Sequence, residues 1–255
     1  MCPVERNTPE PATSVVRRMA MLLDAFGPRD TYVGVNELAR RTGLPRSTVS
    51  RLATEMQANG FLERHDGQLG LSLKMFEWGE RASRRRSMRE VALPYMADLR
   101  EATHQTIHLA ILEGTEVLYV EILRSHNAPR LPSRVGGRLP AHATGVGKAL
   151  LAAAPADVVD RVIATGLPPV GPRTIHTADL LRQQLKRVVA SGIAYEHEES
   201  GPGAVCVASV IRNHGAPVAA ISASGWAGKV DIRRVGPAVH TAALTISRAL
   251  STRYP

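Results

Sequence analysis

The sequence predicts an α+β protein with two domains, a mainly helical N-terminal domain that ends in a hairpin and a larger domain built on one antiparallel sheet. Three observations predict this fold. Apolar residues recur at helical spacing before residue 60. Paired runs of strand-forming residues flank short turns, first over 61–73 and again after residue 105. The chain's 255 residues are enough for two hydrophobic cores.

Two helices are expected near the N-terminus. The first covers residues 14–26, with Ser14 as its N-cap and its apolar side chains at helical spacing. The second is short and covers residues 37–41, with Asn36 as its cap and Gly43 in its C-terminal turn. Together they form the first part of a helical domain.

A third helix is expected to begin at Pro45, whose missing N–H costs nothing in the first turn of a helix. Its apolar residues share one face, and its other face carries short hydroxyl groups and arginines. No acidic residue lies between Glu37 and Glu55. Arginine can donate two hydrogen bonds to a guanine edge, and Ser and Thr can bond bases or phosphates without crowding. The side chains expected to contact DNA are Arg41, Arg46, Ser47, Thr48, Ser50 and Arg51.

A hairpin is expected directly after the third helix. Two strand-like runs, 61–64 and 69–73, are joined by His65-Asp66-Gly67, and Asp-Gly between apolar runs is a strong hairpin signal. The order helix, helix, glycine turn, helix, hairpin is that of a winged helix-turn-helix. The alternative is a small helical subdomain whose basic face is only solvated. The order of the features described above favours the DNA-binding interpretation over this alternative. The net charge of +9 also suits a polyanionic partner such as DNA.

A linker helix is expected over 74–88, and the residue pattern changes at residue 89. Hairpins flanked by helices then predict an α+β domain on a single antiparallel sheet. The chain therefore divides into a winged helix-turn-helix domain (1–73, with a leader over 1–13 that is expected to be disordered), the linker helix (74–88) and a second domain (89–255). In the second domain we expect strands over 106–112, 116–123, 193–198, 204–212 and 217–224, and helices over 155–164, 177–191 and 231–250.

A Gly-rich loop, Gly145-Val146-Gly147-Lys148, opens a helix of the second domain. A phosphate-binding P-loop would need glycine where His142 stands and Ser or Thr where Ala149 stands, so the spacing argues against nucleotide binding. The backbone N–H groups and the dipole at the start of this helix are instead suited to a carboxylate.

The sequence contains no pattern that predicts catalysis, a metal or a cofactor. Cys206 lies in an apolar strand, where a buried thiol is the usual outcome, and no local motif supplies a base such as His197 or His214. The cluster Glu-His-Glu-Glu at 196–199 has ligand-type residues, but only alternate members of a strand converge, and no second cluster stands at zinc spacing. We therefore expect no catalytic residue, no metal and no cofactor.

The sequence favours a cytoplasmic protein without a membrane segment. No apolar run approaches the roughly 18 residues of a membrane span, and the N-terminus lacks the apolar core of a signal peptide. The two cysteines, Cys2 and Cys206, stand at opposite ends of the chain, so no structural disulfide is expected.

Four segments are distinctive in their order and spacing along the chain. They are E-L-A-R-R-T-G-L-P-R-S-T-V-S-R-L, R-E-V-A-L-P, L-P-A-H-A-T-G-V-G-K-A-L-L-A and E-E-S-G-P-G-A-V-C-V-A. On these segments the chain resembles the IclR family of bacterial transcriptional regulators across essentially its whole length. The resemblance implies a winged DNA-binding domain, a linker helix, and a sensing domain with a GAF-like sheet and a pocket for a small metabolite. It also implies dimers, or pairs of dimers, on palindromic operators.

The resemblance further implies which residues bind the effector. In family members that bind small organic acids, the loop before the signature helix presents backbone N–H groups to the ligand. Glu196 stands where acid-binding members commonly have aspartate, and the longer side chain could narrow the pocket or change the favoured ligand. Carried over residue by residue, the implied effector site comprises Ala143, Thr144, Gly145, Glu196, Cys206, Ser222 and Ser224.

The leading interpretation is a transcriptional regulator, a repressor rather than an activator, whose operator binding is controlled by a small organic or aromatic acid. Its partners would be double-stranded operator DNA, the effector and further copies of the chain, as a homodimer or a dimer of dimers. Two other classes stay open at this point. One is an enzyme that uses Cys206 or the Glu/His cluster and dimerises through its N-terminal domain. The other is an architectural DNA-binding protein without a ligand.

Overall fold

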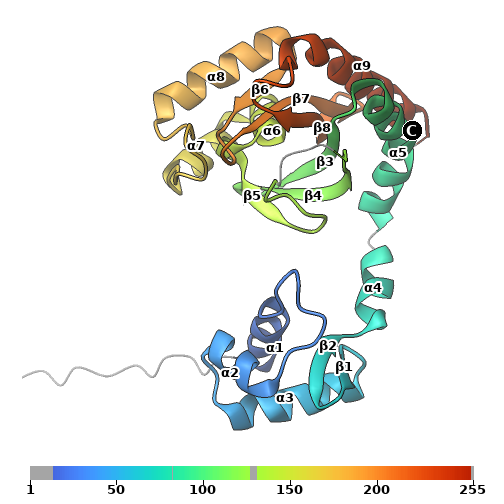
Figure 1. The fold of residues 1–255 in the computed structure, drawn as a ribbon, viewed down its shortest axis with the longest axis vertical. Helices are drawn as coiled ribbons and strands as arrows, with labels where there is room; N and C mark the ends of the chain where they lie inside the picture. The colour runs from blue at the N-terminus through green and yellow to red at the C-terminus, as the bar shows by residue number, and fades with distance from the viewer. Residues whose placement is uncertain (1–13, 82, 127–130, 254–255) are drawn as a thin grey trace, which may run out of the picture. The chain divides into compact units, whose positions relative to one another are not determined.

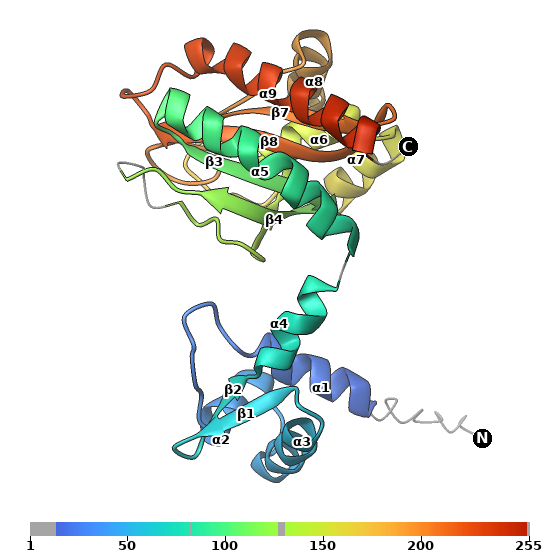
Figure 2. The same cartoon turned by 90° about the vertical axis from the view of Figure 1, so that its right-hand side faces the viewer.

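A computed structural model of the chain describes residues 14–81, 83–126 and 131–253. It divides into two compact units, Met1–Ser83 and Arg84–Pro255, which are drawn in Figures 1 and 2. The leader over 1–13, which the sequence predicts to be disordered, lies outside the described residues. Among the described residues, no helix is both long enough and apolar enough to cross a membrane.

The N-terminal unit is a winged helix-turn-helix, as the sequence predicts. Its core is formed by buried apolar side chains from its first three helices and both strands, including Leu22, Leu38, Val49, Leu62 and Leu69. Its elements are α1 (Val15–Asp24), α2 (Val35–Thr42), α3 (Arg46–Ala58), β1 (Leu62–His65), β2 (Gln68–Leu71) and α4 (Leu73–Glu80).

The helix boundaries in this unit follow local chemistry. Ser14 caps α1 as expected, since its Oγ accepts a hydrogen bond of 3.2 Å from the backbone N–H of Arg17. The helix α2 begins at Val35, earlier than expected, with Gly34 rather than Asn36 at the N-cap. Gly43 ends α2 in the left-handed region with φ of 69°, a conformation that glycine adopts without a steric penalty.

The predicted hairpin is confirmed and forms the wing. Its strands β1 and β2 are antiparallel, with Leu62 opposite Leu71 and His65 opposite Gln68. At the turn, Asp66 and Gly67 both have positive φ, 47° and 78°, as a two-residue hairpin turn requires. The sequence therefore fixes the turn chemistry of the wing locally.

Residues 74–88, expected as one linker helix, contribute to two helices. The helix α4 ends at Glu80, and a second helix, α5, runs over Ser83–Thr103. Gly79 lies at the end of α4, and glycine is a poor helix former. Pro94 lies inside α5, where it removes one backbone donor without ending the helix.

The C-terminal unit is built on one six-stranded antiparallel sheet in the order β5-β4-β3-β8-β7-β6. The two hairpins expected from the sequence, β3–β4 and β7–β8, are present, while β5 and the short 3-10 turn η1 were not expected. The strands are β3 (Thr106–Glu113), β4 (Glu116–Leu123), β5 (Arg138–Pro140), β6 (Ala194–His197), β7 (Ala204–Asn213) and β8 (Ala216–Trp226). Beside α5, the helices are η1 (Ala141–Ala143), α6 (Gly145–Ala153), α7 (Ala156–Ala164), α8 (Ala178–Ser191) and α9 (Ile232–Arg253).

Helices cover both faces of this sheet, and each face has its own core. The helices α5 and α9 cover one face (Figure 2), and the core between them and the sheet includes Val205 and Val207 of β7. The other lies under α6, α7 and α8 and includes Ala208 of β7. Because successive strand residues point to opposite faces, Cys206 shares the α6 face with Ala208. The candidate site lies on this second face.

Candidate functional site

A small cavity lies on the α6 face of the sheet, where five neighbouring strands, β4, β3, β8, β7 and β6, present polar side chains. The strand register places His108 opposite Ser222, Cys206 opposite Ser224, and Glu196 opposite Cys206. The start of α6 and residues 131–133 complete the wall. The free volume is about 20 Å³, which is room for about one water molecule.

Most of the residues implied by the family resemblance meet at this cavity. Ala143 is buried in η1 and does not line it. The sequence did not single out His108, Tyr119 or Ser133, which also line the cavity. The implied residues that line it are Thr144, Gly145, Glu196, Cys206, Ser222 and Ser224.

His108 is a neutral hydrogen-bonding group in the wall of the cavity. Its Nε2 lies 2.9 Å from Ser133 Oγ, and its Nδ1 lies 3.5 Å from the hydroxyl oxygens of both Ser222 and Ser224. Burial lowers the pKa of His108 to about 3, and the positive charge of Arg124 acts in the same direction. A neutral imidazole has one donor and one acceptor nitrogen, so His108 can recognise uncharged polar groups.

Glu196 is buried and holds the turn that follows β6. Its Oε1 accepts hydrogen bonds from the backbone N–H groups of Glu199 (2.6 Å) and Ser200 (3.1 Å). Burial, opposed by the N–H group of Ser200 and assisted by the charge of Glu199, raises the pKa of Glu196 to about 7. The carboxyl therefore titrates close to neutral pH, beside the cavity.

Lys148, the lysine of the Gly-rich loop, points into the protein. Its side chain is fully buried, and its Nζ donates to Glu199 Oε1 at 2.6 Å and to the carbonyl oxygen of Tyr195 at 2.7 Å. Burial raises the pKa of Glu199, and Lys148 opposes that shift. This ammonium group is engaged in an internal ion pair and is absent from the cavity wall, in keeping with the sequence argument against a P-loop.

The start of α6 fits tightly against the sheet and the preceding turn. The N-cap Thr144 accepts a 3.0 Å hydrogen bond from the backbone N–H of Gly147 through its Oγ1. A Cβ at Gly147 would lie 2.0 Å from the carbonyl oxygen of Ala141, and one at Gly145 would lie 2.8 Å from Cys206 Sγ. Glycine at both positions is therefore required for the approach of this helix.

Cys206 has the properties of a buried thiol. Burial raises its pKa to about 12, and the charge of Glu196 adds to the effect. The thiolate is the nucleophilic form of cysteine, so at neutral pH this side chain is a neutral wall group. Burial also raises the pKa of Tyr119 on β4.

The second candidate site is the exposed face of α3. Arg46, Ser47, Ser50 and Arg51 are exposed, and Thr48 is partly buried. The buried face consists of Val49, Leu52, Ala53 and Met56. The sequence-predicted DNA-contact residues on α3 therefore share the solvent side of one helix.

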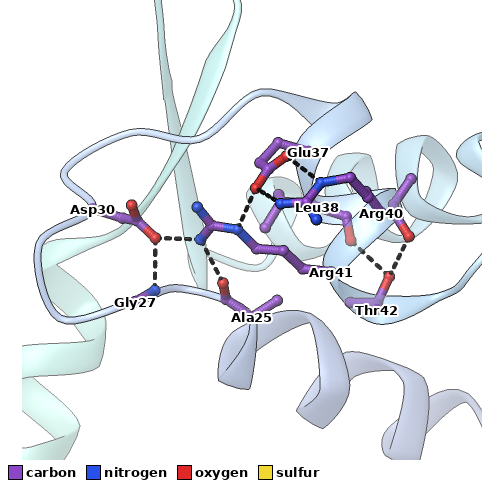
Figure 3. Close-up of polar contacts among 9 residues, drawn as sticks. Ala25, Gly27, Asp30, Glu37, Leu38, Arg40, Arg41 and Thr42 are labelled. Carbon is purple, nitrogen blue, oxygen red and sulfur yellow. Dashed lines mark hydrogen bonds and ion pairs between the residues drawn. The ribbon is translucent and has the colours of Figure 1, made fainter.

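Arg41, also predicted to contact DNA, differs from the arginines of α3 because its guanidinium is engaged within the unit (Figure 3). Its Nε donates to Glu37 Oε1 at 2.8 Å, and its Nη1 donates to the carbonyl oxygen of Ala25 at 2.9 Å and pairs with the Asp30 carboxylate. Hydrogen bonds from Arg40 and then Arg41 lower the pKa of Glu37 to about 2. These groups are charged at neutral pH.

Comparisons with known proteins agree with this architecture. Residues 15–66 match the model of the IclR helix-turn-helix domain, and residues 81–248 match that of the bacterial transcriptional regulator IclR C-terminal domain. The chain is 31% identical to the HTH-type transcriptional regulator XynR of Escherichia coli, over 96% of this chain and 99% of that protein. It is also 31% identical to the transcriptional repressor IclR of Escherichia coli, over 88% of this chain and 85% of that protein.

A solved structure is similar over nearly the whole chain. It is the crystal structure of an IclR homolog from Microbacterium hydrocarbonoxydans complexed with 4-hydroxybenzoate. The two chains are 33% identical and superpose with a TM-score of 0.88, covering 94% of this chain and all of the other, 100%.

We predict that breaking the Lys148–Glu199 pair destabilises the C-terminal unit. In the Lys148→Met variant, Glu199 is left buried without its cation, and removing one partner of a buried pair costs about 3–5 kcal/mol. Urea unfolding of the full-length protein measures the loss. The same substitution at the exposed Lys186 is the control and should have little effect.

The loss in Lys148→Met should also depend on pH. A carboxyl whose pKa is raised on folding contributes stability below its unfolded pKa and loses it as the pH rises through the folded value. Without Lys148 the pKa of Glu199 rises further, so the loss should be small near pH 4 and grow toward pH 8. An equal loss at both pH values, or none at pH 8, would contradict the ion-pair account.

Proposed function

The chain belongs to the IclR family of bacterial transcriptional regulators, and we propose that it is a repressor whose operator binding is controlled by a small organic or aromatic acid. The observation that supports this proposal most is that polar residues from five strands meet at the start of α6. The relatives that the chain matches are named as regulators, and the un-ionised thiol of Cys206 gives no support to the enzyme alternative. We place the protein in the cytoplasm, with the DNA it binds.

We propose that α3 enters the major groove of operator DNA. Exposed arginines and short hydroxyl side chains can bond base edges and phosphates. Arg46 and Arg51 have no intramolecular hydrogen bond or ion pair among the described residues, so their donors are available to DNA. Ser47, Thr48 and Ser50 would add shorter contacts from the same helix.

We propose that the effector carboxylate binds at the start of α6. Backbone N–H groups and the helix dipole favour an anion there, and Thr144 and Gly145 at this helix start line the cavity. Glu196 would repel an anion when ionised, but its pKa of about 7 allows it to take up a proton near neutral pH. Cys206 and Tyr119 would supply uncharged walls.

We propose that the opposite end of the effector carries an uncharged polar group, such as a hydroxyl, that His108 recognises. The neutral imidazole can donate to or accept from such a group, and Ser133 already occupies one of its nitrogens. The Microbacterium homolog was crystallised with 4-hydroxybenzoate, an aromatic acid that carries a hydroxyl group. That compound class therefore suits both ends of this cavity.

The size of the cavity bears on how an effector could act. A free volume of about 20 Å³ is too small for an aromatic acid, so the wall must rearrange when one binds. A ligand shifts an equilibrium only as far as it binds one state better than another. We propose that the effector-bound state of the C-terminal units changes how two winged domains match the spacing of operator half-sites.

We propose that the chain is a homodimer, or a dimer of dimers, with α4 in the interface. On this short helix, Leu73 is 69% exposed and Phe76, one turn later, is 63% exposed. Large apolar side chains exposed side by side are typical of surfaces that bind a partner. A second copy of the chain fits a regulator of palindromic operators.

The DNA-contact proposal predicts the effect of single substitutions on α3. Arg46→Ala and Arg51→Ala should each weaken operator binding about tenfold or more, since one good arginine contact is worth roughly 1–3 kcal/mol. The operator is first selected from a random duplex library with the wild-type protein, and binding is measured by fluorescence anisotropy. Arg187→Ala, on the exposed side of α8, is the matched control. Unchanged operator affinity in both α3 variants would contradict the proposal that α3 is the recognition helix.

The effector proposal is checked by a thermal-shift screen of the full chain against acetate, pyruvate, benzoate and 4-hydroxybenzoate. We expect one of these acids to raise the melting temperature and to release the selected operator. Cys206→Ser and Ser222→Ala should weaken the shift for every acid, while His108→Phe should weaken it most for hydroxylated acids. Thr252→Ala, near the end of α9, should leave the shifts unchanged. DNA binding with a steep salt dependence and no response to any acid would favour an architectural protein instead.

The dimer proposal predicts that Phe76→Glu lowers the association state. A charge in an apolar interface must be desolvated, which opposes association. Sedimentation equilibrium of the full chain measures the mass, with Leu180→Glu on α8 as the control for a new surface charge on an exposed leucine. A wild-type mass retained by Phe76→Glu would rule out α4 as the interface.

A further inference from the structure

Arg41 lies in the last turn of α2, where its guanidinium joins three segments that are separate in the sequence. It reaches the end of α1 through the carbonyl oxygen of Ala25, the following loop through Asp30, and its own helix through Glu37. We infer that Arg41 positions the helix-turn-helix through these contacts and does not bind DNA directly. The inference rests on the proposed operator binding of this chain.

Three of the five N–H donors of the Arg41 guanidinium are used within the unit. The Nε and Nη1 groups make all the contacts of the guanidinium, and the bond between Nε and Glu37 Oε1 measures 2.8 Å (Figure 3). Asp30 is itself held in place, since its Oδ2 accepts a 2.7 Å hydrogen bond from the backbone N–H of Gly27. The loop between α1 and α2 is thus tied to α2 by one side chain.

The charges around Arg41 also argue against a phosphate contact. Two carboxylates, Asp30 and Glu37, touch its guanidinium, and hydrogen bonds from arginines lower the pKa of each. A DNA phosphate that approached Arg41 would meet these two anions. Arg46 and Arg51 have no carboxylate in contact among the described residues, so phosphates are attracted there without this repulsion.

The position of α2 determines that of α3. Leu38 of α2 and Val49 of α3 are both fully buried in the core of the unit. The two helices are joined by a short turn that begins at Gly43. Loss of the Arg41 contacts would therefore loosen the support of α3 without removing a group from the DNA-binding face.

The two roles of Arg41 predict opposite effects of Asp30→Asn on operator binding. If Arg41 contacted a phosphate, this variant would free the guanidinium and remove a negative charge, so affinity would rise. If Arg41 positions α3, the variant weakens the contact between Arg41 and the loop after α1, and we expect operator affinity to fall about three- to tenfold. Asp24→Asn, which removes a nearby exposed charge without an Arg41 contact, is the matched control.

Two variants of Arg41 itself complete the set. In Arg41→Lys the charge is kept but lysine cannot span the same three acceptors, and in Arg41→Ala the guanidinium is removed. Affinity is measured by anisotropy on the selected operator and on a scrambled duplex, across salt concentrations, at a temperature where circular dichroism shows full folding. We expect weaker operator binding, a smaller operator-to-scrambled ratio and an unchanged salt slope. A general loss of stability would not change that ratio in folded protein.

Two results would overturn the inference. One is tighter operator binding by Asp30→Asn than by the wild-type protein. The other is a salt slope that falls by about one in Arg41→Ala, the signature of one lost phosphate contact. Wild-type protein that selects no operator would instead defeat the proposed function itself, and the inference with it.

Discussion

The buried ion pair between Lys148 and Glu199 is the contact on which the candidate pocket depends. It fastens α6 to the turn after β6, and Glu196 caps the same turn through the N–H groups of Glu199 and Ser200. The start of α6 and Glu196 of β6 both line the cavity. A lysine that lies outside the cavity therefore sets the shape in which an effector would bind. The free-energy cost of burying the charges of Lys148 and Glu199 is offset by their pairing and by the hydrogen bond from Lys148 to the carbonyl oxygen of Tyr195.

Strand alternation explains how one sheet serves both stability and recognition. On β7 and β8 the residues under α5 and α9 are apolar except for Ser209, whose Oγ lies 2.9 Å from His240 Nδ1 of α9. Alternate residues on the other face include Cys206, Ser222 and Ser224. The polar set gathers where α6 meets the sheet, next to the hydrophobic cluster of that face. The strands that form the two hydrophobic cores therefore also carry the residues of the candidate effector site.

Local patterns predicted the fold well, and long-range contacts limited the prediction of the site. Asp66-Gly67 and His214-Gly215 carry the positive φ of hairpin turns, so both hairpins could be read from short segments. The roles of His108 and Ser133 depend on a contact across 25 residues, and that of Lys148 on one across 51. No spacing rule links such residues. The same holds for Arg41, whose partners in the loop after α1 are invisible to a reading of charge on α2 alone.

The central claim is that the pocket and the reader helix are coupled, and thermodynamic linkage supplies its most direct test. Calorimetry would measure the affinity of the full chain for the acid that stabilises it most, with and without saturating operator. If the account holds, operator lowers the affinity for the acid by the same factor by which the acid lowers the affinity for operator. Equal affinity for the acid in both titrations would contradict it, because the effector would then have no preference between the free and DNA-bound states.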